Sequence, residues 1–287
     1  MILIDYNQIA LSNIIVQKLN DENMIRHMIL NSIRMYNKKY RDQYGQMVIC
    51  CDGMNTWRKQ YFPQYKAARK KNRDNQTDTD WPEIFRILNL VRDEIRENLP
   101  YKVIHLEGCE ADDVIGTLAL QTQEFGKDEP VKIISSDKDF IQLHRFKNVS
   151  QFSPMQKKEV TDKNPHIYRF NHIIKGDAGD GVPNVKSADN VFVEEGLRQT
   201  PIRAKQVEEW LDNSEKLSEV MDTEVYRNYQ RNKKLIDLTE IPENISEMII
   251  NTFNNSKKPM QMKALNYLIK KRCNLLIESV EEFYNNG

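Results

Sequence analysis

The chain has 287 residues, enough for one large or two modest domains, and its 42 basic side chains balance 42 acidic ones. It has no run of about 18 apolar residues and no basic segment near its N-terminus, which argues against a membrane span and a secretory signal, so we expect a soluble, cytoplasmic protein. Four cysteines without a Cys-x-x-Cys spacing argue against a zinc site and against a disulfide framework.

Three short, mostly apolar segments each lead into an aspartate. They are residues 2–4 before Asp5, residues 47–51 before Asp52, and residues 131–136 before Asp137. Segments that are apolar on both faces and separated by helical stretches are typical of parallel strands, and a further one spans residues 103–106. We therefore predict an α/β fold with a central, mostly parallel sheet flanked by helices. In such sheets ligands bind at the carboxyl ends of the strands, where these aspartates lie.

The segment after the second strand, residues 56–73, is basic and aromatic and contains no acid. Its cations are Arg58, Lys59, Lys66, Arg69, Lys70, Lys71 and Arg73, and its rings are Trp57, Tyr61, Phe62 and Tyr65. A basic run is usually a solvated helix face, but the interleaved rings favour a segment that binds phosphates and stacks on bases. Long helices are expected on either side, at residues 22–44 with Gly45 as the stop, and from the N-cap Asp80 to Leu99.

The helix predicted after residues 103–106 begins with three acids, Glu110, Asp112 and Asp113. One acid in a first turn complements the helix dipole, so three are either a solvated helix start or metal ligands. The strand-end aspartates favour ligands, because two unit charges 4 Å apart repel by about 4 kcal/mol at an effective dielectric of 20, and cations would remove that repulsion. An all-oxygen set favours Mg²⁺ or Mn²⁺ over Zn²⁺.

Further acidic motifs follow. Asp137 and Asp139 form an Asp-x-Asp pair, which is weak evidence alone, and the spacing of an EF-hand is absent. Asp177 and Asp180 lie among glycines, in either a polar hairpin between helices or a turn whose amides approach a phosphate. Residues 248–277 contain basic side chains and no acid, a second basic surface that would support duplex binding.

The order of these motifs resembles that of the flap-endonuclease or 5′-nuclease family over nearly the whole chain. The matching residues are Asp5, Asp52, Tyr65-Lys66-Ala67-Ala68-Arg69, Glu110-Ala111-Asp112-Asp113, Ser136-Asp137-Lys138-Asp139-Phe140 and Gly176-Asp177-x-x-Asp180. Each motif alone is unspecific, but the combination is highly specific. Within the family the chain is most similar to the phage ribonuclease H branch of the T-even type.

The resemblance implies a PIN-like 5′-nuclease fold in two parts. Residues 1–160 would form the α/β nuclease domain, with a basic arch or bridge at 56–80 above the site. Residues 161–287 would form a helical region with a helix-three-turn-helix DNA clamp around 170–195. The implied activity is that of a divalent-metal-dependent 5′ to 3′ exonuclease and flap endonuclease that hydrolyses RNA–DNA and DNA duplexes. Its implied role is the removal of RNA primers from lagging-strand fragments during phage DNA replication.

The resemblance also assigns the site residues. It implies an inner ion held by Asp5, Asp52, Asp112 and Asp137 with support from Glu110 and Asp113, and an outer ion held by Asp139, Asp177 and Asp180. It places the catalytic Lys66 and Arg69 above the ions, and nucleic acid on Arg58, Lys59, Lys70, Lys71, Arg73 and Lys186. The implied cofactors are two Mg²⁺ ions, with Mn²⁺ as a plausible substitute.

The chain departs from the family pattern in the clamp. Gly181 stands where many members have Asn, and Lys186-Ser187-Ala188-Asp189 stands where a second Gly-x-Gly turn would fall. This departure puts a potassium ion at the clamp in doubt and suggests that Lys186 contacts a phosphate directly. The expected partners are duplexes with 5′ ends, flaps or forks, and replication proteins such as a single-stranded-DNA-binding protein or a sliding clamp. We expect a monomer without membrane contact, in the host cell cytoplasm if the gene is phage-encoded.

Two alternatives share part of this pattern. A PIN-type single-strand ribonuclease would have the strand-end acids, but it would not need the 176–185 hairpin or the basic C-terminal region. A catalytically inactive DNA-binding scaffold is disfavoured because no expected acid is missing.

Overall fold

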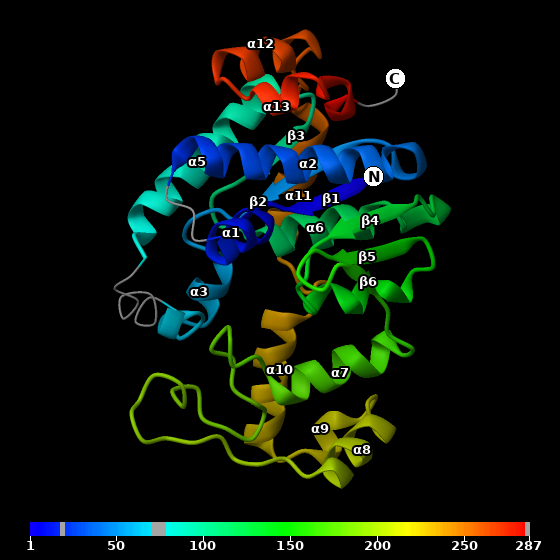
Figure 1. The fold of residues 1–287 in the computed structure, drawn as a ribbon. Coiled ribbons are helices and arrows are strands. Elements are labelled where there is room, and N and C mark those ends of the chain that lie inside the picture. The colour runs from blue at the N-terminus through cyan, green and yellow to red at the C-terminus, as the bar shows by residue number, and fades with distance from the viewer. Residues whose placement is uncertain (18–20, 70–78, 285–287) are drawn as a thin grey trace.

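The computed structural model describes residues 1–17, 21–69 and 79–284, and its centre is a six-stranded sheet of order β3-β2-β1-β4-β5-β6 (Figure 1). The strands are β1 (Ile2–Asp5), β2 (Met47–Cys51), β3 (Lys102–His105), β4 (Val131–Ile134), β5 (Val149–Ser153) and β6 (Lys158–Val160). β1 to β5 pair in parallel, and β6 runs antiparallel to β5. The predicted mostly parallel sheet is therefore confirmed.

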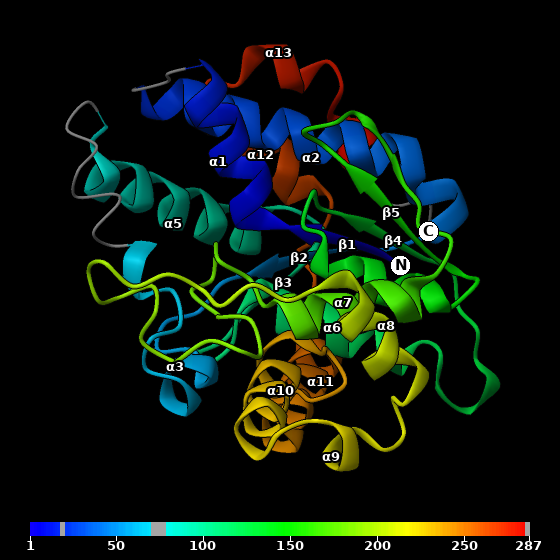
Figure 2. The same cartoon turned by 90° about the horizontal axis from the view of Figure 1, so that it is seen from below.

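Helices cover both faces of this sheet (Figure 2). One face carries α1 (Tyr6–Gln17), α2 (Glu22–Tyr44), α5 (Trp81–Asn98), α12 (Met262–Lys270) and α13 (Asn274–Ile277), and the other carries α6 (Ala111–Gln121) and α11 (Glu243–Asn255). Side chains alternate along β1, so that Ile2 and Ile4 pack into the first core and Leu3 into the second. Burial on both faces explains why β1 is apolar until its final aspartate.

The two long helices α2 and α5 begin where the sequence predicts and end within one residue of the predicted position. Their caps, Asp21 and Asp80, accept hydrogen bonds from the backbone N–H groups of Met24 and Glu83. Gly45 follows α2 with a φ of +73°, a conformation that glycine adopts without strain.

A second group of helices lies below the sheet in Figure 1. It contains α7 (Pro165–Lys175), α8 (Ala204–Asp212), α9 (Leu217–Val220) and α10 (Thr223–Ile236). Phe170, Val185 and Trp210 belong to a core of its own. A smaller cluster packs Phe62 and Tyr65, from the segment after β2, against α7 and α10. The basic segment is thereby fixed between the sheet and this helical group.

The chain returns to the sheet after α10. α11 packs on α6 and β3, while α12 packs on α5, at the end of the molecule opposite α8 and α9 (Figure 1). Residues 248–277, the second basic surface, therefore lie away from the lower helical group. The remaining elements are α3 (Trp57–Tyr61), η1 (Glu124–Gly126), η2 (Asp139–Arg145) and η3 (Val280–Phe283). No helix within the described ranges combines the length and the apolar character that crossing a membrane requires.

Candidate metal centre and nucleic-acid interface

Three acids come together because their strands are neighbours in a parallel sheet. Asp5 ends β1, Asp52 follows β2 and Asp137 follows β4, and β1 lies between β2 and β4. The Ser135 hydroxyl donates to Asp5 Oδ2 at 3.0 Å and accepts from the Asp137 N–H at 3.1 Å, linking two of the acids. Asp52 accepts from the Asn7 amide at 2.7 Å. These contacts orient the carboxylates that were predicted from the sequence to lie at the edge of the sheet.

The start of α6 joins this edge through a close approach at Gly53. A Cβ at Gly53 would lie 1.8 Å from the Leu106 carbonyl oxygen, so the chain after β2 passes directly beneath the loop that precedes α6. The Ala111 N–H donates to Asp52 Oδ1 at 2.9 Å, which fixes the first turn of α6 beside β2. Asp112 follows and joins the charge cluster of Asp5 and Asp137.

Burial and mutual repulsion raise the pKa values of these acids. Burial, and then Asp52, raise the pKa of Asp5 to about 7. Burial, and then Asp137, raise the pKa of Asp112 well above its usual range. Without added positive charge the protein therefore disfavours the ionised form of these carboxylates. Hard divalent cations fit the site, because its donors are carboxylate oxygens and because added positive charge would reverse the repulsion.

Arg58 lies inside the protein, which corrects the expectation that it contacts nucleic acid. Only 3% of the residue is exposed. Its Nη1 lies 2.8 Å from Asp113 Oδ1 and 3.0 Å from Glu110 Oε2, and its Nε donates to the Leu235 carbonyl. Asp113 itself is fully buried, and it also caps the Glu110 N–H at 2.9 Å. This geometry favours a structural role for Asp113 over metal ligation.

Lys66 and Arg69 lie at the rim of the acid cluster. The Lys66 ammonium donates to Glu110 Oε1 at 2.6 Å and lies 3.5 Å from Asp180 Oδ2. Arg69 pairs with Asp180, and the Tyr65 hydroxyl donates to Asp180 Oδ2 at 2.8 Å. Although burial lowers the pKa of Lys66, Asp180 and Glu110 raise it more, so the ammonium stays charged. The burial of Tyr65 was not predicted, because its ring was grouped with the other aromatic side chains of the basic segment.

Asp177 and Asp180 face different partners, although the sequence grouped them. The turn between them closes through the pairing of Asp177 with Val182, and Gly176 enters it with a φ of +68°. Asp177 lies beside His172, with 3.4 Å between its Oδ2 and the ring Nε2. Asp180 instead pairs with Arg69 on the other side of the turn.

His172 is the site residue that sequence reasoning missed. Its Nδ1 lies 3.2 Å from Asp139 Oδ1, so the ring stands between Asp139 and Asp177. Burial, and then Asp137, raise the pKa of Asp139 to about 7, whereas the hydrogen bond with His172 lowers the pKa of Asp177 to about 2. Asp139, His172 and Asp177 form a group with the spacing of metal ligands.

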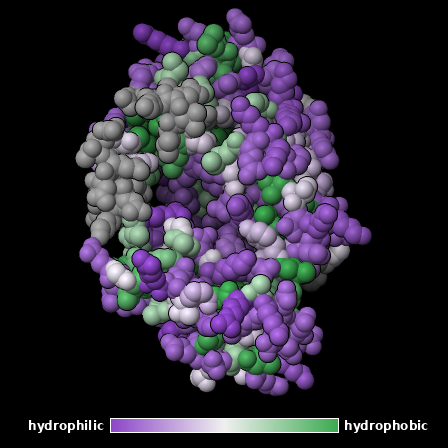
Figure 3. Space-filling view, turned by 60° about the horizontal axis from the view of Figure 1, so that its bottom comes forward, coloured by the Kyte–Doolittle hydropathy of each residue, from purple (hydrophilic) through white to green (hydrophobic). Residues whose placement is uncertain are grey.

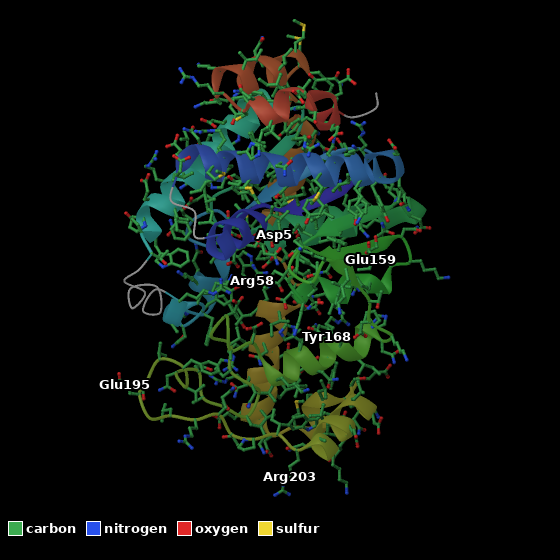
Figure 4. The ribbon with its side chains drawn as sticks, in the orientation of Figure 1. Asp5, Arg58, Glu159, Tyr168, Glu195 and Arg203 are labelled. Carbon is green, nitrogen blue, oxygen red and sulfur yellow. The ribbon has the colours of Figure 1, made fainter. Side chains whose placement is uncertain are left out.

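Two clefts flank the acids. One of about 390 Å³ is lined by Asp52, Lys59, Lys66, Arg69 and Glu110, among others. The other, of about 350 Å³, is lined by Asp137, Asp139, Tyr168, His172 and Asp177, among others. Figure 3 shows a hollow in this face of the molecule with mostly hydrophilic surroundings, and Figure 4 shows Asp5 and Arg58 in the centre with Tyr168 on α7 below them.

The other residues expected to bind nucleic acid are less central. Lys59 is exposed at the mouth of the first cleft. Lys186 is half-buried, with its Nζ 3.4 Å from the Gln206 side-chain oxygen, in the lower helical group. Lys70, Lys71 and Arg73 lie outside the described residues. Residues 176–203 form turns and bends before α8 begins, so the helix-three-turn-helix stays a prediction.

Comparison with known proteins agrees with this geometry. Residues 1–171 match the sequence profile of the 5′-3′ exonuclease N-terminal resolvase-like domain, and residues 164–283 match that of the T4 RNase H C-terminal domain. The chain is 37% identical to the ribonuclease H of enterobacteria phage T4, over 98% of this chain and 95% of that protein. It is 30% identical to a 5′-3′ exonuclease of Buchnera aphidicola, over 52% of this chain and 50% of that protein.

Solved structures show the same fold. A T5 5′-exonuclease with bound divalent metal ions (zinc) has a TM-score of 0.63 at 18% identity, covering 90% of this chain and 99% of that one. A bacteriophage T5 flap endonuclease in a complex with DNA and metal ions has a TM-score of 0.60 at 18% identity, covering 98% of each chain. The fold and the site define a nuclease that hydrolyses phosphodiester bonds. The chain belongs to the 5′-3′ exonuclease family that includes the T4-type ribonucleases H.

Replacing Asp112 with Asn should abolish cleavage and stabilise the protein in EDTA. The change removes one of several mutually repelling charges at nearly constant size, so the variant should melt at a higher temperature than the wild type in EDTA. Substrate binding should survive, because basic side chains make the phosphate contacts. Glu124→Gln, at the exposed first residue of η1 beyond the C-terminal end of α6, is the control and should change neither property. A folded Asp112→Asn protein that cleaves at the wild-type rate would contradict the assignment.

Replacing Arg58 with Met should destabilise the protein, because Asp113 and Glu110 would lose their buried counter-charge. We expect the free energy of unfolding to fall by about 3 kcal/mol, as when one partner of a buried ion pair is removed. The matched control is Lys59→Met at the next, exposed position, where the change should be about 0.5 kcal/mol or less. Urea unfolding of both variants measures the difference, and equal effects would show that Arg58 has no internal role.

Proposed function

We propose that the chain removes RNA primers and adjoining DNA from duplexes with 5′ ends or flaps during phage DNA replication. The observation that carries this proposal is the meeting of Asp5, Asp112 and Asp137 beside the cationic side chain of Lys66. Such a site combines ligands for cations with a binding group for phosphate. The similarity to the T4 ribonuclease H supports an RNA-containing substrate, and the DNA complex of the T5 relative supports a duplex.

We propose two Mg²⁺ ions as cofactors, with Mn²⁺ as a substitute. The inner ion would be held by Asp5, Asp52, Asp112 and Asp137. The outer ion would be held by Asp139 and Asp177, and Asp180 would contribute its charge from the rim of the acid cluster. Bound there, the ions would lower the pKa of the attacking water and stabilise charge on the reacting phosphate. Ser135 and Asn7 keep their carboxylate partners in a fixed orientation before any ion binds.

Lys66 and Arg69 would bind the reacting phosphate. Without substrate their charges are balanced by Glu110 and Asp180, and an incoming phosphate would take over that role. The backbone supports this placement, because the Lys66 N–H donates to the Asp180 carbonyl at 2.7 Å and so attaches the basic segment to the 176–181 turn.

The remaining cations would position the duplex. Lys59 would contact a phosphate at the first cleft, and the sequence adds Lys70, Lys71 and Arg73 to the same segment. Lys186 would contact a phosphate in the lower helical group, which is proposed to act as the helix-three-turn-helix clamp without a potassium ion. The single-stranded-DNA-binding protein or sliding clamp as partner, the monomeric state and the host cytoplasm are proposed from the family alone.

The lower helical group also separates this proposal from the alternatives. A PIN-type single-strand ribonuclease has no need for a turn that holds Lys66 and Arg69 through Asp180. An inactive scaffold would gain nothing from carboxylates whose pKa values are raised by mutual repulsion.

A cleavage assay tests the proposal. With Mg²⁺ the protein should shorten a 5′-labelled RNA–DNA duplex from its 5′ end and release the arm of a 5′-flap DNA duplex, whereas EDTA should stop both reactions. A single-stranded RNA of the same sequence serves as the control, because the clamp and basic segment are suited to duplex. Preferential cutting of the single strand would favour the PIN-type ribonuclease, and no cutting of any substrate would favour the scaffold.

Replacing Lys66 with Ala should lower the single-turnover rate at saturating enzyme by about ten-fold or more. An interaction that strengthens as charge develops on the phosphate contributes to the rate itself, on the scale of an oxyanion donor. Lys59→Ala should instead weaken binding modestly, reduce the salt dependence by about one unit of slope, and leave that rate unchanged. Equal saturated rates for the two variants would mean that Lys66 only attracts the phosphate backbone.

A further inference from the structure

His172 stands between carboxylates from two other parts of the chain. It lies in the last turn of α7, with Asp139 of η2 at 3.2 Å from Nδ1 and Asp177 of the following turn at 3.4 Å from Nε2. Each of the three side chains has one ligand atom within 4.8 Å of those of the other two. A nitrogen donor therefore faces the position proposed for the outer ion.

We infer that His172 is a nitrogen ligand of the outer ion, so that this position binds Mn²⁺, the proposed substitute, more tightly than Mg²⁺. The inference rests on the proposed two-ion nuclease centre. One ring nitrogen would bind the ion together with one carboxylate, while the other donates to the second carboxylate, an arrangement that is common for metal-bound imidazoles. Mg²⁺ takes oxygen ligands, whereas imidazole suits transition ions. The two ions of the centre would then differ, with oxygen donors at the inner position.

The surroundings of His172 suit a ligand better than a core residue. The ring lines the cleft of about 350 Å³ together with Asp137 and Asp139, and 14% of its side chain is exposed. Tyr168, one turn earlier on α7, packs its ring edge against the imidazole at a centroid distance of 5.9 Å and limits its rotation. An ion and its water ligands can therefore reach a ring that is already oriented.

A competing account makes His172 a spacer. In that account the imidazole hydrogen-bonds Asp139 and Asp177 and holds them at the right separation, while the ion contacts only carboxylate oxygens and water. Loss of the histidine would weaken ion binding in both accounts. Only direct ligation places nitrogen in contact with the ion, so a spectroscopic measurement on the bound ion distinguishes them.

Electron spin echo envelope modulation of bound Mn²⁺ tests the inference. The wild-type protein should show the ¹⁴N coupling of a directly bound imidazole. The His172→Asn variant should lose that coupling and should bind the more weakly held of its two Mn²⁺ ions about ten-fold or more less tightly than the wild type does. The matched control is His166→Asn, at an exposed histidine on the same helix, which should keep both properties. Asp112→Asn should also keep the coupling, because it damages the inner position.

The outcomes are decisive in each case. Bound Mn²⁺ without ¹⁴N coupling in the wild type, coupling that survives in His172→Asn, or no Mn²⁺ binding at all would overturn the inference. Should His172→Asn fail to fold, the spectra of the wild type, His166→Asn and Asp112→Asn still decide whether nitrogen is bound near the outer position. The Mg²⁺ cleavage assay separates the role of His172 from the proposed nuclease function. Flap cleavage without ¹⁴N coupling would contradict only the assignment of His172 as a ligand. Coupling without cleavage of any substrate would contradict the proposed nuclease function.

Discussion

Repulsion between carboxylates is the constraint on which the site depends. Because β2, β1 and β4 are parallel neighbours, Asp52, Asp5 and Asp137 must lie at the same edge of the sheet, and α6 adds further acids there. At 4 Å each ionised pair costs about 4 kcal/mol at an effective dielectric of 20. The protein offsets part of this cost with its own cations, of which Arg58 is enclosed and Lys66 lies at the rim. The ions proposed here would offset the rest.

The enclosed and the rim cations serve different purposes. Arg58 links three elements, because it starts from α3, pairs with Asp113 of α6 and donates to the Leu235 carbonyl of α10. The beginning of the basic segment is therefore fixed to both the sheet and the lower helices. Lys66 lies farther along the same segment and contacts Glu110 and Asp180, the carboxylates that a phosphate would replace in the proposed function. The buried Arg58 therefore anchors the segment that carries Lys66.

Sequence reasoning predicted the position of a residue where a general rule of fold topology determines it. It failed where tertiary packing determines that position. The strand-end aspartates were predictable because apolar strands separated by helices give parallel sheets. The burial of Arg58 was not, because α3 has five residues and so short a helix shows no periodicity that separates its inner from its outer cations. His172 lies beside the apolar Ile173 and Ile174, and only the folding of α7 against η2 brings it to Asp139. Its assignment as a ligand remains a proposal.

The turn at residues 176–181 connects the two halves of the site. Asp177 faces His172 on one side and Asp180 faces Lys66 on the other, although two residues separate them in the chain. Gly181 lies so close to the basic segment that a Cβ there would be 3.0 Å from the Gln64 carbonyl oxygen. The same turn therefore sets the position of Asp177, the proposed outer ligand, and of Lys66 and Arg69, the proposed phosphate-binding cations. One turn of six residues carries both contacts, so the position of Asp177 beside His172 is coupled to the position of the basic segment. In the proposed function, phosphate binding by Lys66 and Arg69 and ligation of the outer ion by Asp177 would therefore depend on the same turn.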